Sequence, residues 1–183
     1  MFSKVENAFV TIFLFLLLFQ HVDLNAVDNE INGNTPQLDL LLPVNSRELL
    51  QVIEDGKSTL TLLNFWATWC DPCVEEFPDL VALSKSYPSD QLRIIFVSTD
   101  FEKQLPSVRE FLSKQNLDQV SYYKNEGDQT FINAMNPEWS GALPATFVYD
   151  IVGNKLDFWI GSKTLEQLET IIKAHLKATK TAE

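Results

Sequence analysis

The sequence predicts an α/β fold with a mixed central sheet and helices on both of its faces. Two segments, 59–65 and 92–98, are almost continuously apolar, which is typical of buried parallel strands. A helical pattern lies between them, and the order strand, helix, strand predicts parallel pairing. Near the end of the chain, segments 145–149 and 155–160 flank a short turn, which predicts an antiparallel hairpin.

The other elements are predicted from helix caps and from hydrophobic periodicity. Asn45 followed by Glu48 resembles a capping box, so a helix is expected directly after a short strand over 38–42. Thr164 and Gln167 form a similar pair before the last helix. Further helices are expected over 71–87, from near Pro106 and over 128–135, and a further strand over 119–123.

The first 26 residues resemble a secretory signal peptide. Lys4 precedes an apolar run over 8–19, and these twelve residues are fewer than the ~20 that a membrane-spanning helix needs. We therefore expect a signal peptide over 1–26 that is removed after Ala26. The alternative is that residues 8–19 remain as an uncleaved membrane anchor.

The remainder of the chain has the length of one domain. We expect a linker over 27–37, a single domain over 38–178 and a tail over 179–183. Export would place this domain in the periplasm or another extracytoplasmic space, where disulfides persist. The formal net charge of −11 repels phosphate, which argues against nucleic-acid binding. We expect the protein to be a monomer.

Cys70 and Cys73 are the only cysteines in the sequence, and three interpretations compete. A disulfide between residues so close together closes a small loop and therefore stabilises little. A zinc site needs four ligands, and the two histidines lie in the leader (His21) and on the last predicted helix (His175). A redox pair fits best, because a Cys-x-x-Cys at a strand-to-helix turn places a sulfur where the helix dipole favours a thiolate. No metal is expected.

Three segments resemble a known family. The segment WATWCDPC at 66–73 closely resembles the active-site segment of the thioredoxin superfamily, and EFP at 76–78 narrows this to the exported TlpA/ResA-like thiol–disulfide reductases. LPATF at 143–147 is similar to the cis-proline loop of that family, which binds the backbone of the target. The resemblance covers about residues 38–176. It implies a thioredoxin-like fold with an N-terminal extension and with an inserted α/β segment, 100–136, before the cis-proline loop.

The resemblance implies a role for each catalytic residue. Cys70 and Cys73 would form the redox-active disulfide, with Cys70 as the attacking thiol and Cys73 as the resolving thiol. Thioredoxins have a buried aspartate where this chain has Asn64, so Glu76 is expected to exchange the proton of Cys73 instead. Burial near the thiols should raise the pKa of Glu76. The alternative is an ordinary solvated glutamate in the first turn of a helix.

Other residues are expected to contact the target or to support the cysteines. The residues expected to bind the target are Trp69, Asp71, Pro72, Leu143 and Pro144. Trp66 is expected to pack beneath the cysteines, and Trp139 is a further candidate for the apolar rim around them. Pro72 suits the first turn of a helix, where its missing N–H is no loss.

The charges beside the cysteines favour reduction of targets over their oxidation. Negative charge on Asp71 and Glu76 opposes the Cys70 thiolate, and a poorly stabilised thiolate makes a better electron donor. The resemblance implies a protein-disulfide reductase that needs no cofactor and receives electrons from a membrane thiol–disulfide partner. Its targets would be disulfides of exported proteins, such as the haem-binding cysteines of apocytochrome c. The alternatives are an oxidase or isomerase of the same fold and a non-enzymatic module such as a copper chaperone.

Overall fold

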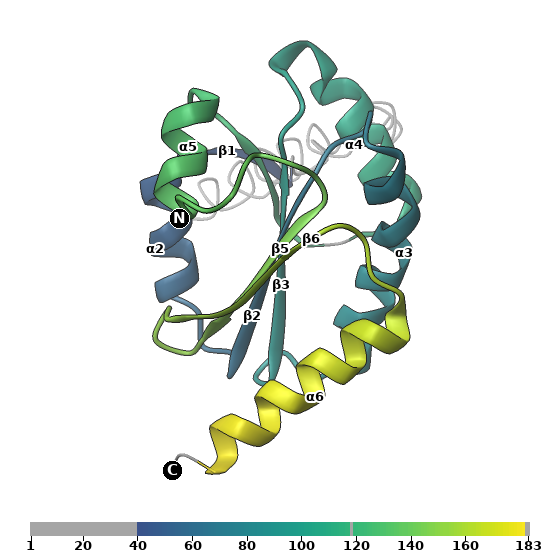
Figure 1. Ribbon diagram of the computed structural model, residues 1–183. Helices are drawn as coiled ribbons and strands as arrows, with labels where there is room; N and C mark the ends of the chain where they lie inside the picture. Colours follow the sequence, from purple (N-terminus) through teal and green to yellow (C-terminus); the bar gives the residue numbers. More distant parts are fainter. Residues whose placement is uncertain (1–39, 118, 182–183) are drawn as a thin grey trace, which may run out of the picture. The chain divides into compact units, whose positions relative to one another are not determined.

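Figure 1 shows the computed structural model, which describes residues 40–117 and 119–181. A six-stranded sheet lies at its centre, with the strands in the order β1-β4-β3-β2-β5-β6. Strands β1, β4, β3 and β2 run parallel to one another, whereas β5 pairs antiparallel with β2 and with β6. The strands are β1 (Leu41–Val44), β2 (Leu60–Trp66), β3 (Leu92–Ser98), β4 (Ser121–Lys124), β5 (Ala145–Asp150) and β6 (Lys155–Ile160). The predicted mixed sheet is confirmed.

Helices cover both faces of this sheet, as predicted (Figure 1). Leu80, Val108 and Ile172 bring α3, α4 and α6 into the apolar cluster on one face. Leu49 and Phe131 bring α2 and α5 into the cluster on the opposite face. The helices are α2 (Ser46–Glu54), α3 (Asp71–Ser86), α4 (Leu105–Lys114), α5 (Asp128–Met135) and α6 (Leu165–Thr181), with a short 3-10 helix, η2 (Glu102–Gln104).

The central strand β2 positions the cysteine segment. All seven of its residues are buried, because strands pair on both sides and helices pack on both faces. It is parallel to β3, with Leu60 opposite Leu92 and Trp66 opposite Ser98. The carboxyl ends of both strands therefore meet at one edge of the sheet, which brings the loop before Cys70 next to the segment that follows Ser98.

The predicted inserted segment, 100–136, contributes η2, α4, β4 and α5 between β3 and β5. Its strand β4 lies between β3 and β1 in the sheet, so the insertion extends the parallel half. Its two α-helices lie on opposite faces, α4 with α3 and α5 with α2. The insertion therefore adds to both apolar clusters.

The ends of the domain differ in detail from the prediction. The capping box is confirmed, since Asn45 Oδ1 accepts from the Glu48 N–H at 2.9 Å and Glu48 Oε2 accepts from the Asn45 N–H at 3.0 Å. The first described strand is Leu41–Val44 rather than 38–42, and its Pro43 is tolerated because β1 is an edge strand. Helix α6 continues to Thr181 and so extends into the range 179–183 that was expected to be a tail.

The predicted signal peptide over 1–26 and linker over 27–37 lie outside the described residues. Among the helices of 40–117 and 119–181, none has both the length and the apolar character that a membrane crossing needs.

Candidate redox site

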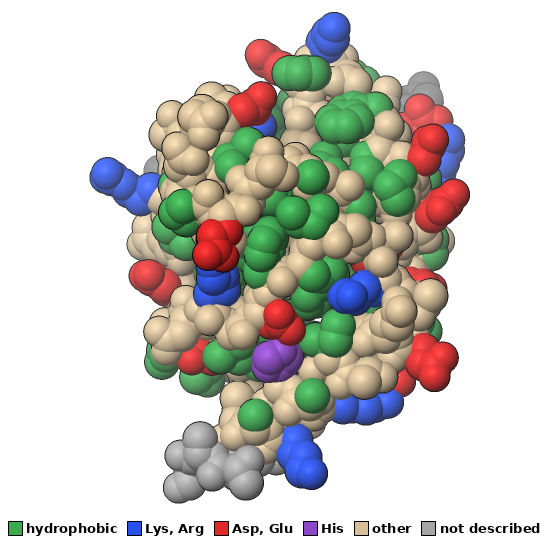
Figure 2. Space-filling model, viewed as in Figure 1, with side chains coloured by type: hydrophobic (Ala, Val, Ile, Leu, Met, Phe, Trp, Pro, Cys, Tyr) green, Lys and Arg blue, Asp and Glu red, His purple; other side chains and the backbone are tan. Residues whose placement is uncertain are grey.

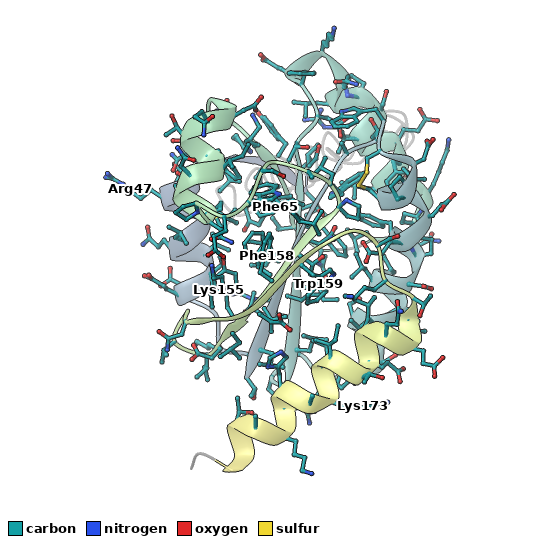
Figure 3. The ribbon with its side chains drawn as sticks, in the orientation of Figure 1. Arg47, Phe65, Lys155, Phe158, Trp159 and Lys173 are labelled. Atoms are coloured by element: carbon teal, nitrogen blue, oxygen red, sulfur yellow. A yellow bond between two sulfur atoms is a disulfide. The ribbon has the colours of Figure 1, made fainter. Side chains whose placement is uncertain are left out.

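The two cysteines form a disulfide at the amino end of α3 (Figure 3). Cys70 is the N-cap of the helix, with an extended backbone, and its carbonyl oxygen accepts from the N–H groups of Cys73 and Val74, both at 3.0 Å. Pro72 lies in the first turn, as predicted. Cys70 is 6% exposed and Cys73 is 2% exposed, so Cys70 is the more exposed residue of the pair. This order of exposure matches the predicted division into attacking and resolving thiols.

Aromatic side chains support the disulfide from below. Trp66 is buried in the same apolar cluster as both cysteines, as predicted. Its ring centroid lies 4.8 Å from that of Phe77 and 4.9 Å from that of Phe111. Because Phe77 belongs to α3 and Phe111 to α4, this contact fixes the cysteine-bearing helix against the end of β2.

Glu76 lies on α3 three residues after Cys73, on the same side of the helix. It is only 3% exposed, so the alternative of a solvated surface glutamate is wrong. Its Oε1 accepts from the Lys163 N–H at 2.8 Å, whereas Oε2 has no hydrogen-bond partner within the described part of the chain. Each carboxylate oxygen can accept more than one hydrogen bond, so the carboxylate of Glu76 accepts fewer hydrogen bonds than a charged group would accept in water.

Burial raises the pKa of Glu76 from 4.5 to about 7. Smaller influences oppose this shift, led by the Lys163 N–H and followed by the Asn64 amide and the positive charge of Lys163. The negative charge of Asp79 adds slightly to the increase. Near neutral pH the group can therefore either accept or donate a proton, as general acid–base chemistry requires.

Asn64 occupies the strand position where thioredoxins would carry an aspartate. It is buried, and its Nδ2 donates to Thr146 Oγ1 at 3.0 Å. This bond ties the middle of β2 to the start of β5. Asn64 thus joins two strands, and it cannot exchange a proton as an aspartate could.

The peptide bond between Leu143 and Pro144 is cis, as the resemblance implied. Pro144 is buried, and its carbonyl oxygen accepts from the Gly161 N–H at 2.8 Å. Gly161 has φ +93°, a backbone conformation that favours glycine. The turn that follows β6 therefore makes two contacts at the site. Its Gly161 N–H bonds to the proline loop, and its Lys163 N–H bonds to Glu76.

An apolar groove of about 320 Å³ lies next to Trp69 and Leu143, which flank Cys70 and Pro144 in the chain. Trp69 is 55% exposed and Phe101 is 62% exposed, unusual values for such large apolar side chains. Figure 2 shows hydrophobic side chains gathered on the viewed surface between α5 and α4. The groove is lined by Trp69, Thr99, Phe101, Lys124, Asp128, Phe131, Ile132, Trp139, Gly141 and Leu143.

The predicted target-binding residues differ in exposure. Trp69, Asp71 and Pro72 are exposed beside the disulfide, whereas Leu143 is half-buried in the wall of the groove. Trp139 is not the exposed rim residue that the sequence suggested, because only 3% of it is exposed. Its ring stacks on Phe65 at 4.7 Å, and its Nε1 donates to the carbonyl oxygen of Ala142 at 2.9 Å. It supports the groove from within the core.

Sequence reasoning missed Asp100 and Phe101 at the site. Asp100 is buried and accepts a hydrogen bond from the Thr68 N–H at 2.9 Å. A usable signal was present, because polar residues follow directly after the buried strand β3. Residues at the carboxyl ends of neighbouring parallel strands meet at one edge, so this segment had to lie near the cysteine loop.

Comparisons with known proteins are consistent with this site. The pattern of the AhpC/TSA family matches residues 44–154. Thioredoxin-like protein YneN of Bacillus subtilis is 33% identical over 118 residues, which are 64% of this chain and 65% of that protein. Thiol-disulfide oxidoreductase ResA of Bacillus thuringiensis is 31% identical over 122 residues, which are 66% of each. The match therefore spans just under two thirds of the length of these relatives.

Solved structures share the fold. A thiol:disulfide interchange protein of the thioredoxin family from Chlorobium tepidum has a TM-score of 0.56 at 26% identity, covering 69% of this chain and 83% of that one. StoA from Bacillus subtilis has a TM-score of 0.50 at 24% identity. The predicted thioredoxin-like fold and the resemblance to ResA-like proteins are confirmed. The chain belongs to the AhpC/TSA family.

Proposed function

We propose that this protein is a thiol–disulfide oxidoreductase that reduces disulfides in exported polypeptides. The observation that carries the proposal is the Cys70–Cys73 disulfide, held at the amino end of a helix between an apolar groove and a buried glutamate. A structural disulfide of this loop length would stabilise little. It also would not require exposed aromatic residues on one side and a proton-exchanging carboxyl group on the other.

In the proposed reaction, the reduced protein transfers two electrons to its target. The Cys70 thiolate attacks one sulfur of the target disulfide, which forms a mixed disulfide and releases one target thiolate. Cys73 loses its proton to the Glu76 carboxylate and attacks the Cys70 sulfur. This step forms the Cys70–Cys73 disulfide and releases the second target thiolate. The two target thiolates then take up protons, and a dithiol donor reduces the disulfide again.

The groove suggests how the target is held during this exchange. A polypeptide joined to Cys70 must cross the surface between Trp69 and the loop of Leu143 and Pro144. One of its apolar side chains can then enter the groove against Phe101. Exposed aromatic residues are favourable contacts for a partner that covers them, because burial of their rings releases water. We therefore propose that the target is an extended polypeptide segment with an apolar side chain near its cysteine.

The cellular setting of the proposal rests on the leader-like residues 1–26 and on the resemblance of segments 66–73 and 76–78 to exported reductases. In an oxidising compartment the pair needs a supply of electrons, for which we propose a membrane thiol–disulfide donor. Targets in this setting would be exported proteins with disulfides that must be opened, including apocytochrome c before haem attachment. A reduction potential close to that of a disulfide isomerase or oxidase would instead favour the alternative function, an oxidase or isomerase with the same fold.

Trapping of the mixed disulfide tests the proposal. Cys73→Ser leaves Cys70 able to attack but removes the resolving thiol, so disulfide-linked complexes should accumulate with extracytoplasmic polypeptides. The matched control is the double variant Cys70→Ser/Cys73→Ser, which should trap none. If folded Cys73→Ser protein captures no polypeptide under conditions that preserve disulfides, the proposed exchange through Cys70 is wrong.

A further inference from the structure

Asp100 is a buried carboxyl group at the end of β3, and only 3% of it is exposed. Its Oδ1 accepts from Thr68 Oγ1 at 2.5 Å, and its Oδ2 accepts from the Thr68 N–H at 2.9 Å. Oδ2 also accepts from Ser98 Oγ at 2.8 Å, and Ser98 Oγ in turn accepts from the Asp100 N–H at 3.0 Å. Both oxygens are therefore bonded, and Thr68 is held at two points.

Thr68 lies in the loop that joins β2 to Cys70. A second link lies beside it, since the Thr99 N–H donates to the Trp66 carbonyl oxygen at 2.8 Å. Within the loop, the Cys70 N–H donates to the Ala67 carbonyl oxygen at 3.2 Å, which is a long bond. The two bonds from Thr68 to Asp100 are therefore side-chain restraints on the segment that carries the attacking sulfur, beside the backbone bond between Thr99 and Trp66.

The same pair of residues also joins the two exposed walls of the groove. Trp69 follows Thr68 in the chain, and Phe101 follows Asp100. Both aromatic side chains line the groove, yet neither is buried enough to be fixed by core packing. Their relative placement depends on the backbone that carries them, and the contact between Thr68 and Asp100 joins those two stretches of backbone.

We propose that Asp100 is a positioning residue for the exchange reaction, which acts through Thr68. It sets where Cys70 lies relative to the groove, and so couples the reactive sulfur to the surface that holds the target. The proposal rests on the proposed function for its catalytic consequence. The restraint on the loop itself can be measured without any activity.

Substitutions of Thr68 separate this role from general stability. Thr68→Val keeps the shape of the side chain but removes the hydroxyl that donates to Asp100, whereas Thr68→Ser keeps the hydroxyl. Thr170→Val is the matched control, because the Thr170 hydroxyl donates to the Glu166 carbonyl oxygen on the exposed side of α6. Asp100→Asn keeps the size of the side chain but weakens all of its accepted bonds.

Hydrogen exchange of the oxidised protein, followed residue by residue by NMR, measures the restraint directly. A lost hydrogen bond to a charged group should speed exchange of the Thr68 and Cys70 amides roughly tenfold or more in Thr68→Val. The Leu63 amide in the middle of β2 should keep its wild-type rate. Thr68→Ser and Thr170→Val should keep wild-type rates at all three amides. Unchanged exchange at Thr68 in both Thr68→Val and Asp100→Asn would overturn the proposed restraint.

A comparison of two substrates tests the catalytic consequence. Wild-type and variant proteins are given insulin, whose disulfides join polypeptides, and oxidised glutathione, which is too small to span the sulfur and the groove. We expect Thr68→Val to reduce insulin roughly tenfold more slowly, with a smaller loss for glutathione. A purely structural role would lower both rates by the same factor, and that result would overturn the proposal. If the wild type reduces neither substrate, the proposed function fails, while the exchange rates still decide whether Asp100 restrains the loop.

Discussion

Two buried carboxyl groups lie on either side of the cysteine loop and differ in how their oxygens are bonded. Glu76 and Asp100 are each 3% exposed. Asp100 accepts hydrogen bonds on both oxygens from Thr68 and Ser98. Glu76 accepts one backbone bond on Oε1, and Oε2 has no partner within the described residues. Equal burial therefore produces one group that is held firmly and another that is left able to take up a proton.

The comparison shows why burial alone does not identify a proton-exchanging group. A buried carboxyl group whose two oxygens both accept hydrogen bonds can serve to hold a loop. Burial raises the pKa of Glu76 to about 7, and the few hydrogen bonds that reach this carboxyl group offset only part of the increase. Substitutions at the two carboxyl groups and in the groove beside the cysteines can break this contrast.

Glu76→Gln should change how stability depends on pH. The native pKa of about 7 lies above the ordinary value of 4.5, so the native state binds the proton more tightly than the unfolded state does. Wild-type stability should fall as pH rises from about 4.5 to 7 and then stay level. The variant lacks this loss, and at pH 8 it should be more stable than wild type by up to about 3 kcal/mol. Urea denaturation of the oxidised proteins across pH measures the difference, with Glu75→Gln at the exposed neighbour as control.

Glu76→Gln should also slow release of the target. Without a carboxylate to accept the Cys73 proton, resolution of the mixed disulfide should slow roughly 100-fold near pH 8. In wild type the rate should rise through pH 7 as Glu76 loses its proton, and this inflection should be absent from the variant. Stopped-flow measurement of resolution from a preformed mixed disulfide checks both points. An inflection that survives in the variant would assign the proton to another group.

Asp100→Asn should destabilise the protein at pH 7 by about 2 kcal/mol, since bonds to a charged acceptor are replaced by weaker or mismatched ones. Urea denaturation gives the value. Asp71→Asn is the matched control, because Asp71 is exposed and its replacement should change stability by less than about 0.5 kcal/mol. If Asp100→Asn changed the free energy of unfolding as little as Asp71→Asn, Asp100 would not hold the loop, and the contrast between Asp100 and Glu76 would be wrong.

Trp69→Ala and Phe101→Ala should change stability least, by less than about 0.5 kcal/mol each, because both side chains are exposed. Their effect should appear in reduction of polypeptide disulfides, with kcat/KM lowered roughly tenfold by loss of the apolar contact. Val152→Ala is the control, since Val152 is 68% exposed in the turn between β5 and β6. Wild-type kcat/KM in both aromatic variants would show that the target does not use the groove.

The sequence was sufficient for those features that depend on local pattern. Continuous apolar runs predicted the buried strands, and the spacing of Cys73 and Glu76 predicted that they share a side of α3. The fixed distance along a helix makes such a prediction possible. The burial of Glu76 matched the resemblance, but its hydrogen bond did not follow from any pattern. Its donor, the Lys163 N–H, lies 87 residues further along the chain.

The features that sequence reasoning missed all depend on which distant segments meet. The role of Asp100 required the register of β2 on β3, which places the ends of both strands together. Trp139 was assigned to the rim because it lies just before the proline loop in the sequence, whereas its burial depends on stacking with Phe65 in the core. Tertiary packing determines the burial and the contacts of such residues, and the local sequence pattern does not indicate them.

The reduction potential of the Cys70–Cys73 couple decides whether this pair donates electrons to target disulfides or withdraws them. Equilibration against a glutathione or dithiothreitol buffer at pH 7, with the two states separated after thiol alkylation, gives the value. A pair that donates electrons to target disulfides should have a potential more negative than about −200 mV, towards the range of thioredoxin. A potential near −120 mV, which is that of a strong oxidant, would contradict the account.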